Sequence, residues 1–471
     1  MGRLSIRVCR SLAELAPHRD ALDALNLASR RPCPFSTLAY VETFLAHDEF
    51  GAHERELLFM LAFEDERLVG YLPLRKHQER TLGLPWTKIS VLISHDTDRP
   101  HLIARREDEA RCAQAFYAHL LEHERGWSLL ELALQDSESA LLEVPPLKPW
   151  RHWARRFPNM PVSRAKLPWK SMPEYLGAMP GSHRKNFMRS LRRTFGAGHA
   201  EAVSCADPRG LPAMLDLYLA LERRSWKAAG HAGISRTPQR EAFFRALGEA
   251  RQPMRLGVHL LLVDDLPVSG AVTGEFEGVL HGFETCFDQD YEDLGCGHLG
   301  VLLAFRHAFS RGLGELNLNG NYAYNKSNFG GVATETVAVQ VYRVGSLPWL
   351  KARLGQLKQW WRPSDAQAIA FNPERRAHEQ HAEVRPPRLD ERAQVRSTLL
   401  ALEQRGVELE RLSGAALETT FAVKPEGGSP HDVGPARVDR DADVQPAGHH
   451  RPGDRQRAGA ALRELGAGGR R

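Results

Sequence analysis

Apolar and polar positions follow the same order in two stretches of the sequence, residues 56–135 and 257–320. In the second stretch, short apolar runs separated by tight turns predict an antiparallel meander of three strands. These strands cover 257–263, 268–276 and 279–287. A polar loop then leads to a helix over 300–312, whose apolar residues recur at helical spacing, and to a last strand over 314–320. Gly312 suits the C-terminal cap of that helix.

The first stretch predicts the same elements in the same order. Its strands cover 56–63, 68–75 and 88–94, followed by a helix over 107–124 and a strand over 127–135. Because this unit occurs twice, we expect an α/β (α+β) protein with a duplicated fold, in which helices flank mixed and largely antiparallel sheets. The predicted halves are residues 1–150 and 151–362.

The two halves differ in the loop that precedes the helix. The second half has LGCGHLG at 294–300, which reads as G-x-G-x-x-G, whereas the corresponding loop at 95–106 contains no glycine. Glycines at this spacing let a backbone approach a phosphate, which then meets amide groups and the positive end of a helix. A dinucleotide site is disfavoured, because the loop follows a meander and the next strand ends in asparagines rather than an acid. A glycine-rich turn without a ligand is the alternative.

The composition changes after LKQWWRPSDAQ at 357–367. Residues 390–423 predict one or two helices, so we assign 363–425 to a helical extension. From 426 to 471 the sequence has no aromatic residue, Ile, Met or Lys, and such a segment cannot bury enough apolar surface to offset its ordering entropy. We expect a disordered tail, either native or an out-of-frame extension. We also expect a chain shortened to end near Pro363 to fold as stably as the full chain.

Charge and cysteine content favour a soluble cytoplasmic protein. The 63 basic and 58 acidic residues give a net charge of +5, which is no argument for binding DNA. No signal-peptide core and no apolar stretch of membrane-spanning length occurs in the sequence. The six cysteines form no C-x-x-C pair, which indicates reduced thiols. We expect no metal; the alternative is a zinc site built from His281, Cys286, Cys296 and His298.

The order of these elements resembles the GNAT acyltransferase superfamily. It is most similar to the duplicated CelD-type branch associated with cellulose and exopolysaccharide biosynthesis, which is itself similar to Fem-type peptidoglycan-bridge transferases. The stretches that carry the resemblance lie between residues 165 and 345 and include SHRKNFMRSLRRTFGAGH, LVDDLPVSGAVTGEF, CFDQDYEDLGCGHLGVLLAFRHAFSRGL and LNGNYAYNKSNFGG. The resemblance implies an acyl-CoA co-substrate, with acetyl-CoA expected. It would bind at Gly295, Cys296, Gly297, His298 and Gly300.

Acyl transfer needs a group that takes the acceptor's proton and donors that stabilise the tetrahedral oxyanion. Glu284 is our preferred base and His281 the second candidate; the alternative for each is a buried, hydrogen-bonded residue of a central strand. Strict alternation along 279–287 would place His281, Phe283 and Thr285 on one face and Gly282, Glu284 and Cys286 on the other. Lys326 is the candidate for neutralising the oxyanion or an acceptor phosphate. Its alternative is a surface lysine whose stem covers Phe329.

The acceptor side is predicted around a basic helix over 182–196, with Ser182 as its N-cap. Its apolar face consists of Phe187, Met188, Leu191 and Phe195. The remaining surface carries a dense set of basic residues, either an anion-binding wall or a solvated face. The predicted substrate-binding residues are Arg184, Asn186, Arg189, Trp226 and Asn325.

Together these features predict an acyl-CoA-dependent N- or O-acyltransferase. Its acceptor would be a sugar nucleotide, a glycan precursor or a small amine in cell-surface polysaccharide biosynthesis. Two alternatives remain open: a Fem-like transferase that uses aminoacyl-tRNA, and a non-catalytic binding module associated with a polysaccharide synthase.

Overall fold

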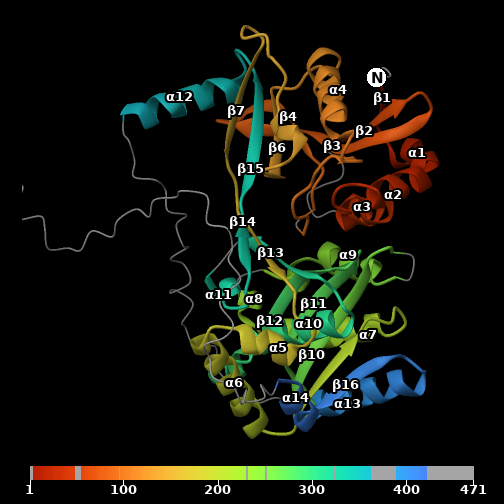
Figure 1. Cartoon of the computed structure of the whole chain (residues 1–471), viewed down its shortest axis with the longest axis vertical. Coiled ribbons are helices and arrows are strands. Elements are labelled where there is room, and N and C mark those ends of the chain that lie inside the picture. The colour runs from red at the N-terminus through yellow and green to blue at the C-terminus, as the bar shows by residue number, and fades with distance from the viewer. Residues whose placement is uncertain are drawn as a thin grey trace, which may run out of the picture. The chain divides into compact units, whose positions relative to one another are not determined.

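The structure is a computed structural model in which residues 4–47, 55–94, 96–229, 232–249, 252–321, 324–361 and 389–421 are described. Within these ranges the strands form two sheets, which we call sheet A and sheet B (Figure 1). The tail predicted at 426–471 lies outside the described residues. None of the described helices combines the length and the apolar character that crossing a membrane would take.

Sheet A is built mainly from the first half of the chain, in the order β1-β2-β3-β4-β6-β15-β7, with the short β5 paired to β3. Its strands are β1 (Leu4–Cys9), β2 (Arg55–Glu64), β3 (Arg67–Thr81), β4 (Leu84–Val91), β5 (Ile103–Ala104), β6 (Leu129–Asp136), β7 (His152–Pro158) and β15 (Thr336–Arg343).

Sheet B has the order β14-β8-β13-β12-β11-β10-β9-β16. Its strands are β8 (Val162–Lys166), β9 (Ala200–Cys205), β10 (Arg255–Val263), β11 (Leu266–Phe276), β12 (Val279–Phe287), β13 (Glu315–Asn321), β14 (Val332–Thr334) and β16 (Leu409–Ser413). Both sheets are largely antiparallel, and each has one parallel pair in the equivalent place, β4 with β6 and β12 with β13. The predicted duplication is confirmed.

Helices flank both sheets. The first half contains α1 (Leu12–Leu15), α2 (Arg19–Leu27), α3 (Leu38–Ala46) and α4 (Glu109–Glu122). The second contains α5 (Met172–Ala178), α6 (Gly181–Gly196), α7 (Leu211–Glu222), α8 (Trp226–Ala229), α9 (Pro238–Leu247), α10 (Gly297–Ser310), α11 (Tyr324–Ser327) and α12 (Leu347–Trp361). Two further helices, α13 (Leu389–Gln404) and α14 (Gly414–Phe421), follow near the C-terminus.

Local sequence features explain where two of these helices begin and end. α10 ends before Gly312, whose φ of +66° is favoured by glycine, and the N–H of Leu313 returns to the carbonyl of Ala308. α6 begins at Gly181 after Pro180, so the prediction that Ser182 is the N-cap was wrong by two residues; Ser182 lies in the first turn. The apolar face predicted for α6 does pack on the core.

Two strand pairs cross between the sheets. β7 in sheet A leads into β8 in sheet B, and β14 in sheet B leads into β15 in sheet A. β7 pairs with β15, and β8 pairs with β14, so the two crossings run side by side. The predicted boundary between the halves at residue 150 therefore does not separate the two sheets, because β15 lies in the second half of the chain but belongs to sheet A.

The largest hydrophobic cluster is shared by the two halves. It contains Phe35, Tyr40 and Phe63 from the first half together with Phe243 and Phe283 from the second. A second cluster lies on the other face of sheet B, under α5, α6 and α10. A third joins sheet A to α4.

The C-terminal segment belongs to this core. The predicted helices over 390–423 are confirmed as α13 and α14, and between them β16 pairs with β9 at the edge of sheet B. Leu399 and Leu402 of α13 are buried in the largest cluster, whereas Leu417 and Phe421 of α14 are buried in the second. The expectation that a chain ending near Pro363 folds as stably as the full chain does not fit this packing, because α13, β16 and α14 follow the polar segment 363–388 and bury apolar residues against the core.

We therefore predict opposite results for two shortened chains. A chain that ends at Pro425 should unfold at the same temperature as the full chain, since only the polar tail is removed. A chain that ends at Pro363 should lose several kcal/mol, because each fully buried large apolar side chain contributes about 1.5–3 kcal/mol. Thermal and urea unfolding followed by circular dichroism measure both. Equal stability of the two chains would contradict the packing of α13 and α14.

Candidate active site

A wedge opens between β12 and β13 in the middle of sheet B. These parallel strands are paired over three residue pairs only, the last of which is His281 with Asn317. β12 nevertheless continues to Phe287, and β13 changes register against β8 after Asn317. Asn319, with a φ of +47°, bends β13 at this point. Among the described strands, none pairs with this edge of β12 beyond the wedge, so its main-chain N–H and C=O groups are available to a ligand.

A bulge in β12 changes which side chains share a face. The register between β11 and β12 shifts at Phe283, which stands between the paired residues Gly282 and Glu284. As a result Cys286 is buried in the same cluster as Phe283, whereas Thr285 is exposed. The prediction of strict alternation along β12 was wrong, because the extra residue reverses the pattern beyond it.

The glycine turn predicted to hold phosphates lies between β12 and α10, directly beside α6. Gly295 has a φ of +69°, and a side chain there would meet the hydroxyl of Ser190 on α6. A Cβ atom on Gly297 would lie 2.8 Å from the ring of Phe287. On Gly300 it would lie 2.7 Å from the Ser269 hydroxyl and 3.0 Å from the Gly270 carbonyl oxygen of β11. Close packing thus requires these glycines whether or not a phosphate binds.

The two other residues of the turn differ in exposure. Cys296 is buried, its Sγ lies 3.5 Å from the carbonyl oxygen of Val268, and burial raises the pKa of its thiol to about 12. It can contribute its backbone to a ligand but not its side chain. His298 is exposed on the first turn of α10, near Phe187 and Phe329. Because Cys296 and Cys286 are buried in clusters on opposite faces of sheet B, the geometry does not support the zinc alternative.

The basic face of α6 is close to this turn. Asn186 and Arg189 are exposed, and Arg184 donates a hydrogen bond of 3.0 Å to the carbonyl of Gly177. Arg193 donates to the carbonyl of Asp293, 3.1 Å away in the segment before the turn. The structure thus places α6 beside the glycine turn, through Arg193 and Ser190.

A chain of buried charges joins the second half to the loop at 96–102 of the first. Arg240 on α9 donates to both carboxylate oxygens of Asp96, at 2.8 and 2.9 Å, and at 2.8 Å to Glu284 on β12. Glu284 also pairs with Lys227 on α8. Burial alone would raise the pKa of Glu284, but Lys227 and Arg240 outweigh it and hold that pKa below its usual range. Trp226 lies half-exposed beside Lys227.

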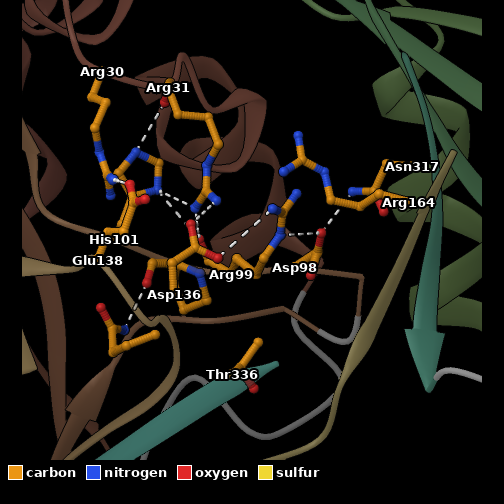
Figure 2. Close-up of polar contacts among 12 residues, drawn as sticks. Arg30, Arg31, Asp98, Arg99, His101, Asp136, Glu138, Arg164, Asn317 and Thr336 are labelled. Atoms are coloured by element: carbon orange, nitrogen blue, oxygen red, sulfur yellow. Dashed lines mark hydrogen bonds and ion pairs between the residues drawn. The ribbon is translucent and has the colours of Figure 1, made fainter. Parts of the chain in front are cut away.

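A second polar chain crosses the junction of the sheets (Figure 2). Asp98 accepts hydrogen bonds from Arg99 at 3.1 Å and from the side-chain amide of Asn317 at 2.6 Å. The same amide lies 3.4 Å from Nδ1 of His281. Burial lowers the pKa of His281 to about 4, so its ring is neutral at pH 7 and Nδ1 can accept from Asn317. Arg99 also faces Asp136, with 3.7 Å between Nη1 and Oδ1.

Lys326 lies at the end of the wedge formed by β13. Its ammonium group donates a 3.0 Å hydrogen bond to the carbonyl of Leu318 and another to that of Asn319, the residue that bends the strand. Burial lowers the pKa of Lys326 to about 8. The ring of Phe329 stacks on Phe187 at a centroid distance of 5.1 Å. The side chain of Asn325 lies outside the described part of the structure.

The comparisons with known proteins agree with this geometry. Residues 181–326, from α6 to α11, match the family described as an acetyltransferase (GNAT) domain. This part of the chain is a GNAT acetyltransferase domain. The match supports an acyltransferase activity for this domain. A search of curated proteins gave no match.

Three solved structures illustrate the structural likeness. FemX has 11% identity and a TM-score of 0.49, with 72% of this chain and 98% of that chain covered. A tandem GNAT protein from the clavulanic acid biosynthesis pathway has 14% identity and a TM-score of 0.38, with 73% and 99% covered. A GCN5-related N-acetyltransferase from Sphaerobacter thermophilus has 12% identity and a TM-score of 0.31, with 72% and 95% covered.

Sequence reasoning missed the contribution of the first half to the site. Asp96 and Asp98 come from the loop without glycine, and their partners Arg240 and Asn317 come from the GNAT domain. Residues 95–101 are almost entirely polar or charged, although they follow a buried strand. A run of polar residues directly after a buried strand was the sequence feature that could have indicated Asp96 and Asp98 as site residues.

We predict that His281 makes the protein less stable in acid. The folded ring has a pKa of about 4, below the ordinary value of 6.5, so the unfolded chain binds an additional proton between these values. Its contribution to stability is therefore complete above pH 6.5 and is lost as the pH falls toward 4, by at most about 1.4 kcal/mol per pH unit. Unfolding in urea at several pH values should give a shallower dependence for His281→Gln. The exposed His123→Gln is the control and should keep the native slope.

Proposed function

We propose that this protein transfers an acyl group, with acetyl-CoA as the expected donor, to an amine or hydroxyl of a sugar or polysaccharide precursor. The observation that carries the proposal is the coincidence of the GNAT match with the wedge, the glycine turn and the basic face of α6. The resemblance to CelD-type transferases supports the choice of acceptor class.

The donor would lie along the second half. Amide groups at the start of α10 and the positive end of its dipole suit the pyrophosphate of CoA, and the exposed Arg189 and Arg192 of α6 can neutralise its charge. The edge of β12 in the wedge offers main-chain groups to the amides and the thioester of the pantetheine arm. Gly297 is not a suitable probe of this binding, because a side chain there would collide with Phe287 and report folding instead.

The acceptor would approach where the loop 96–102 meets Asn317. Its amine or hydroxyl attacks the thioester carbonyl, the C–S bond breaks, and CoA leaves as the thiol once it takes up a proton. Direct attack needs no covalent enzyme intermediate, and Cys286 is buried with a pKa raised to about 12, which disfavours it as a nucleophile.

The surroundings of Glu284, His281 and Lys326 fit the catalytic roles predicted for these residues to different degrees. Two cations lower the pKa of Glu284, which weakens it as a base and favours a role in holding Arg240 and Lys227. His281 is neutral and buried, and its low pKa likewise makes it a weak base. Lys326 keeps a third N–H beyond its two carbonyl partners, and its charge lies in a partly desolvated place where it can stabilise an oxyanion.

The direct test is release of the CoA thiol from acetyl-CoA in the presence of amino sugars, nucleotide sugars and small amines. A transferred acetyl group on one of these acceptors, seen by mass spectrometry, would support the proposal. Transfer from charged tRNA in the absence of any thiol release would contradict it.

For Lys326 we predict a loss of turnover with little loss of donor binding. Lys326→Met keeps much of the stem and removes the charge, so kcat should fall about tenfold or more, equivalent to ~1.4 kcal/mol or more. Because the charged form is the active one, kcat in the native protein should fall as the pH rises through about 8. In Lys326→Arg the fall in kcat should occur at higher pH, because arginine keeps its charge there. Full activity in Lys326→Met would leave Lys326 with the structural role of holding the bend of β13.

For α6 we predict an effect on the donor alone. Arg189→Gln with Arg192→Gln removes two exposed charges without touching the core, so KM for acetyl-CoA should rise severalfold while kcat stays near the native value. At 100 times Kd, a ligand raises the free energy of unfolding by about 2.7 kcal/mol, so thermal shifts report the same change. The exposed Arg106→Gln in the first half is the matched control. An unchanged KM would place the CoA phosphates elsewhere.

A further inference from the structure

Helix α12 stands out because it has little contact with the rest of the described chain. It follows β15 at the end of sheet A and extends away from β7 and β15 (Figure 1). Its start is anchored: Pro348 is buried, and the N–H of Leu350 donates to the carbonyl of Ser346 at 3.0 Å. Leu350 and Leu354, one turn apart on the same side, are 48% and 52% exposed.

The sequence of α12 is amphipathic and basic. Leu357 and Trp361 continue the spacing of Leu350 and Leu354, so apolar residue types recur at i, i+4, i+7 and i+11. From 344 to 363 the sequence contains four basic residues and no acidic residue. Such a helix has an apolar stripe whose described members, Leu350 and Leu354, are about half exposed, and it has a surplus of positive charge.

A second apolar and basic feature lies beside the start of α12. Trp150 is 73% exposed between Lys148 and Arg151, which are also exposed. The carbonyl of Arg151 accepts a 2.9 Å hydrogen bond from the N–H of Val344, just before α12. The guanidinium group of Arg353 on α12 lies 5.4 Å from the ring centroid of Trp153 in β7. These contacts place the tryptophan loop and α12 at the same end of sheet A.

We propose that α12 and the loop 148–151 bind the surface of an anionic lipid bilayer. Leucine and tryptophan next to lysine and arginine, without acidic residues, is the composition of helices that lie in the membrane interface. Interfaces between proteins are instead depleted of lysine. The helix would lie flat with its leucines among the acyl chains and its basic residues at the phosphate groups, while the acyltransferase domain stays in water. This inference does not depend on the identity of the acceptor.

The test is co-sedimentation of the full chain with lipid vesicles. One set contains phosphatidylcholine alone and the other contains about 30% phosphatidylglycerol, which gives the negative surface that basic segments recognise. We expect binding to the anionic vesicles only, and we expect it to decrease with added salt, because exposed charges are screened. Equal binding to both vesicles, or to neither, would overturn the proposal.

Two variants separate the apolar and the charged contributions. Leu350→Ser with Leu354→Ser should abolish sedimentation with the anionic vesicles, and Lys351→Gln should weaken partitioning about fivefold, the effect expected of one basic residue near such a surface. Both variants change exposed side chains and should melt at the native temperature. Leu400→Ser on α13 is the matched control, since Leu400 is 52% exposed, like Leu354, but lies in another element. Loss of binding in Leu400→Ser would overturn the assignment to α12.

The same variants test the competing occupant, a second copy of this chain. If α12 were a dimer contact, the double leucine variant would turn a dimer into a monomer in analytical ultracentrifugation. A dimer that dissociates in this variant, with no vesicle binding by the native chain, would replace the lipid proposal. A native chain that binds anionic vesicles and has the same mass as the variant would support it.

Discussion

The structure depends on the antiparallel ribbon that crosses between the two sheets. β7 and β15 belong to sheet A, their continuations β8 and β14 belong to sheet B, and both crossings occur within a few residues. At the crossing, the N–H of Asn159 donates to the carbonyl of Thr336, and the hydroxyl of Thr336 donates to the carbonyl of Met160, both at 2.8 Å. Sheet A therefore takes β7 and β15 from the chain after residue 150, whereas every strand of sheet B comes from that later part. Since buried main-chain groups must be paired, the first half cannot complete sheet A alone.

The two copies of the unit are complementary rather than equal. The loop 96–102 of the first copy contacts α9 and β13 of the second, where Asp96 pairs with Arg240 and Asp98 accepts a hydrogen bond from Asn317. Removing one partner from a buried pair such as Arg240 and Asp96 costs about 3–5 kcal/mol, so these contacts fix the position of the loop. The copy with glycines supplies the turn before α10, and the copy without them supplies the carboxylates.

The sequence predicted the elements well, because hydrophobic periodicity is a local property. The strand expected at 279–287 coincides with β12, and the other members of both repeats are found, although β3 extends to Thr81 and β4 begins already at Leu84. The bulge at Phe283 was missed, because it arises from pairing with β11, which a period of two along β12 does not contain. The glycines at 295–300 were read as an approach to phosphate, although packing against Ser190, Phe287 and Ser269 requires the same residues. Spacing alone cannot separate these two causes.

The GNAT match covers only one side of the candidate site. The match covers 181–326 and so includes the wedge edge of β12, the glycine turn and α6, all on the side proposed for the donor. Asp96, Asp98 and Arg99 lie outside it, as does Arg164 of β8, which pairs with Glu315 at the start of β13. The residues proposed to bind the acyl donor, which determines the class of reaction, thus all lie in the matched part. In the proposed function, the choice of acceptor depends on residues of the first half, such as Asp96 and Asp98, which contact Arg240 and Asn317 of the matched domain. The functional unit is therefore the pair of halves and not the matched domain.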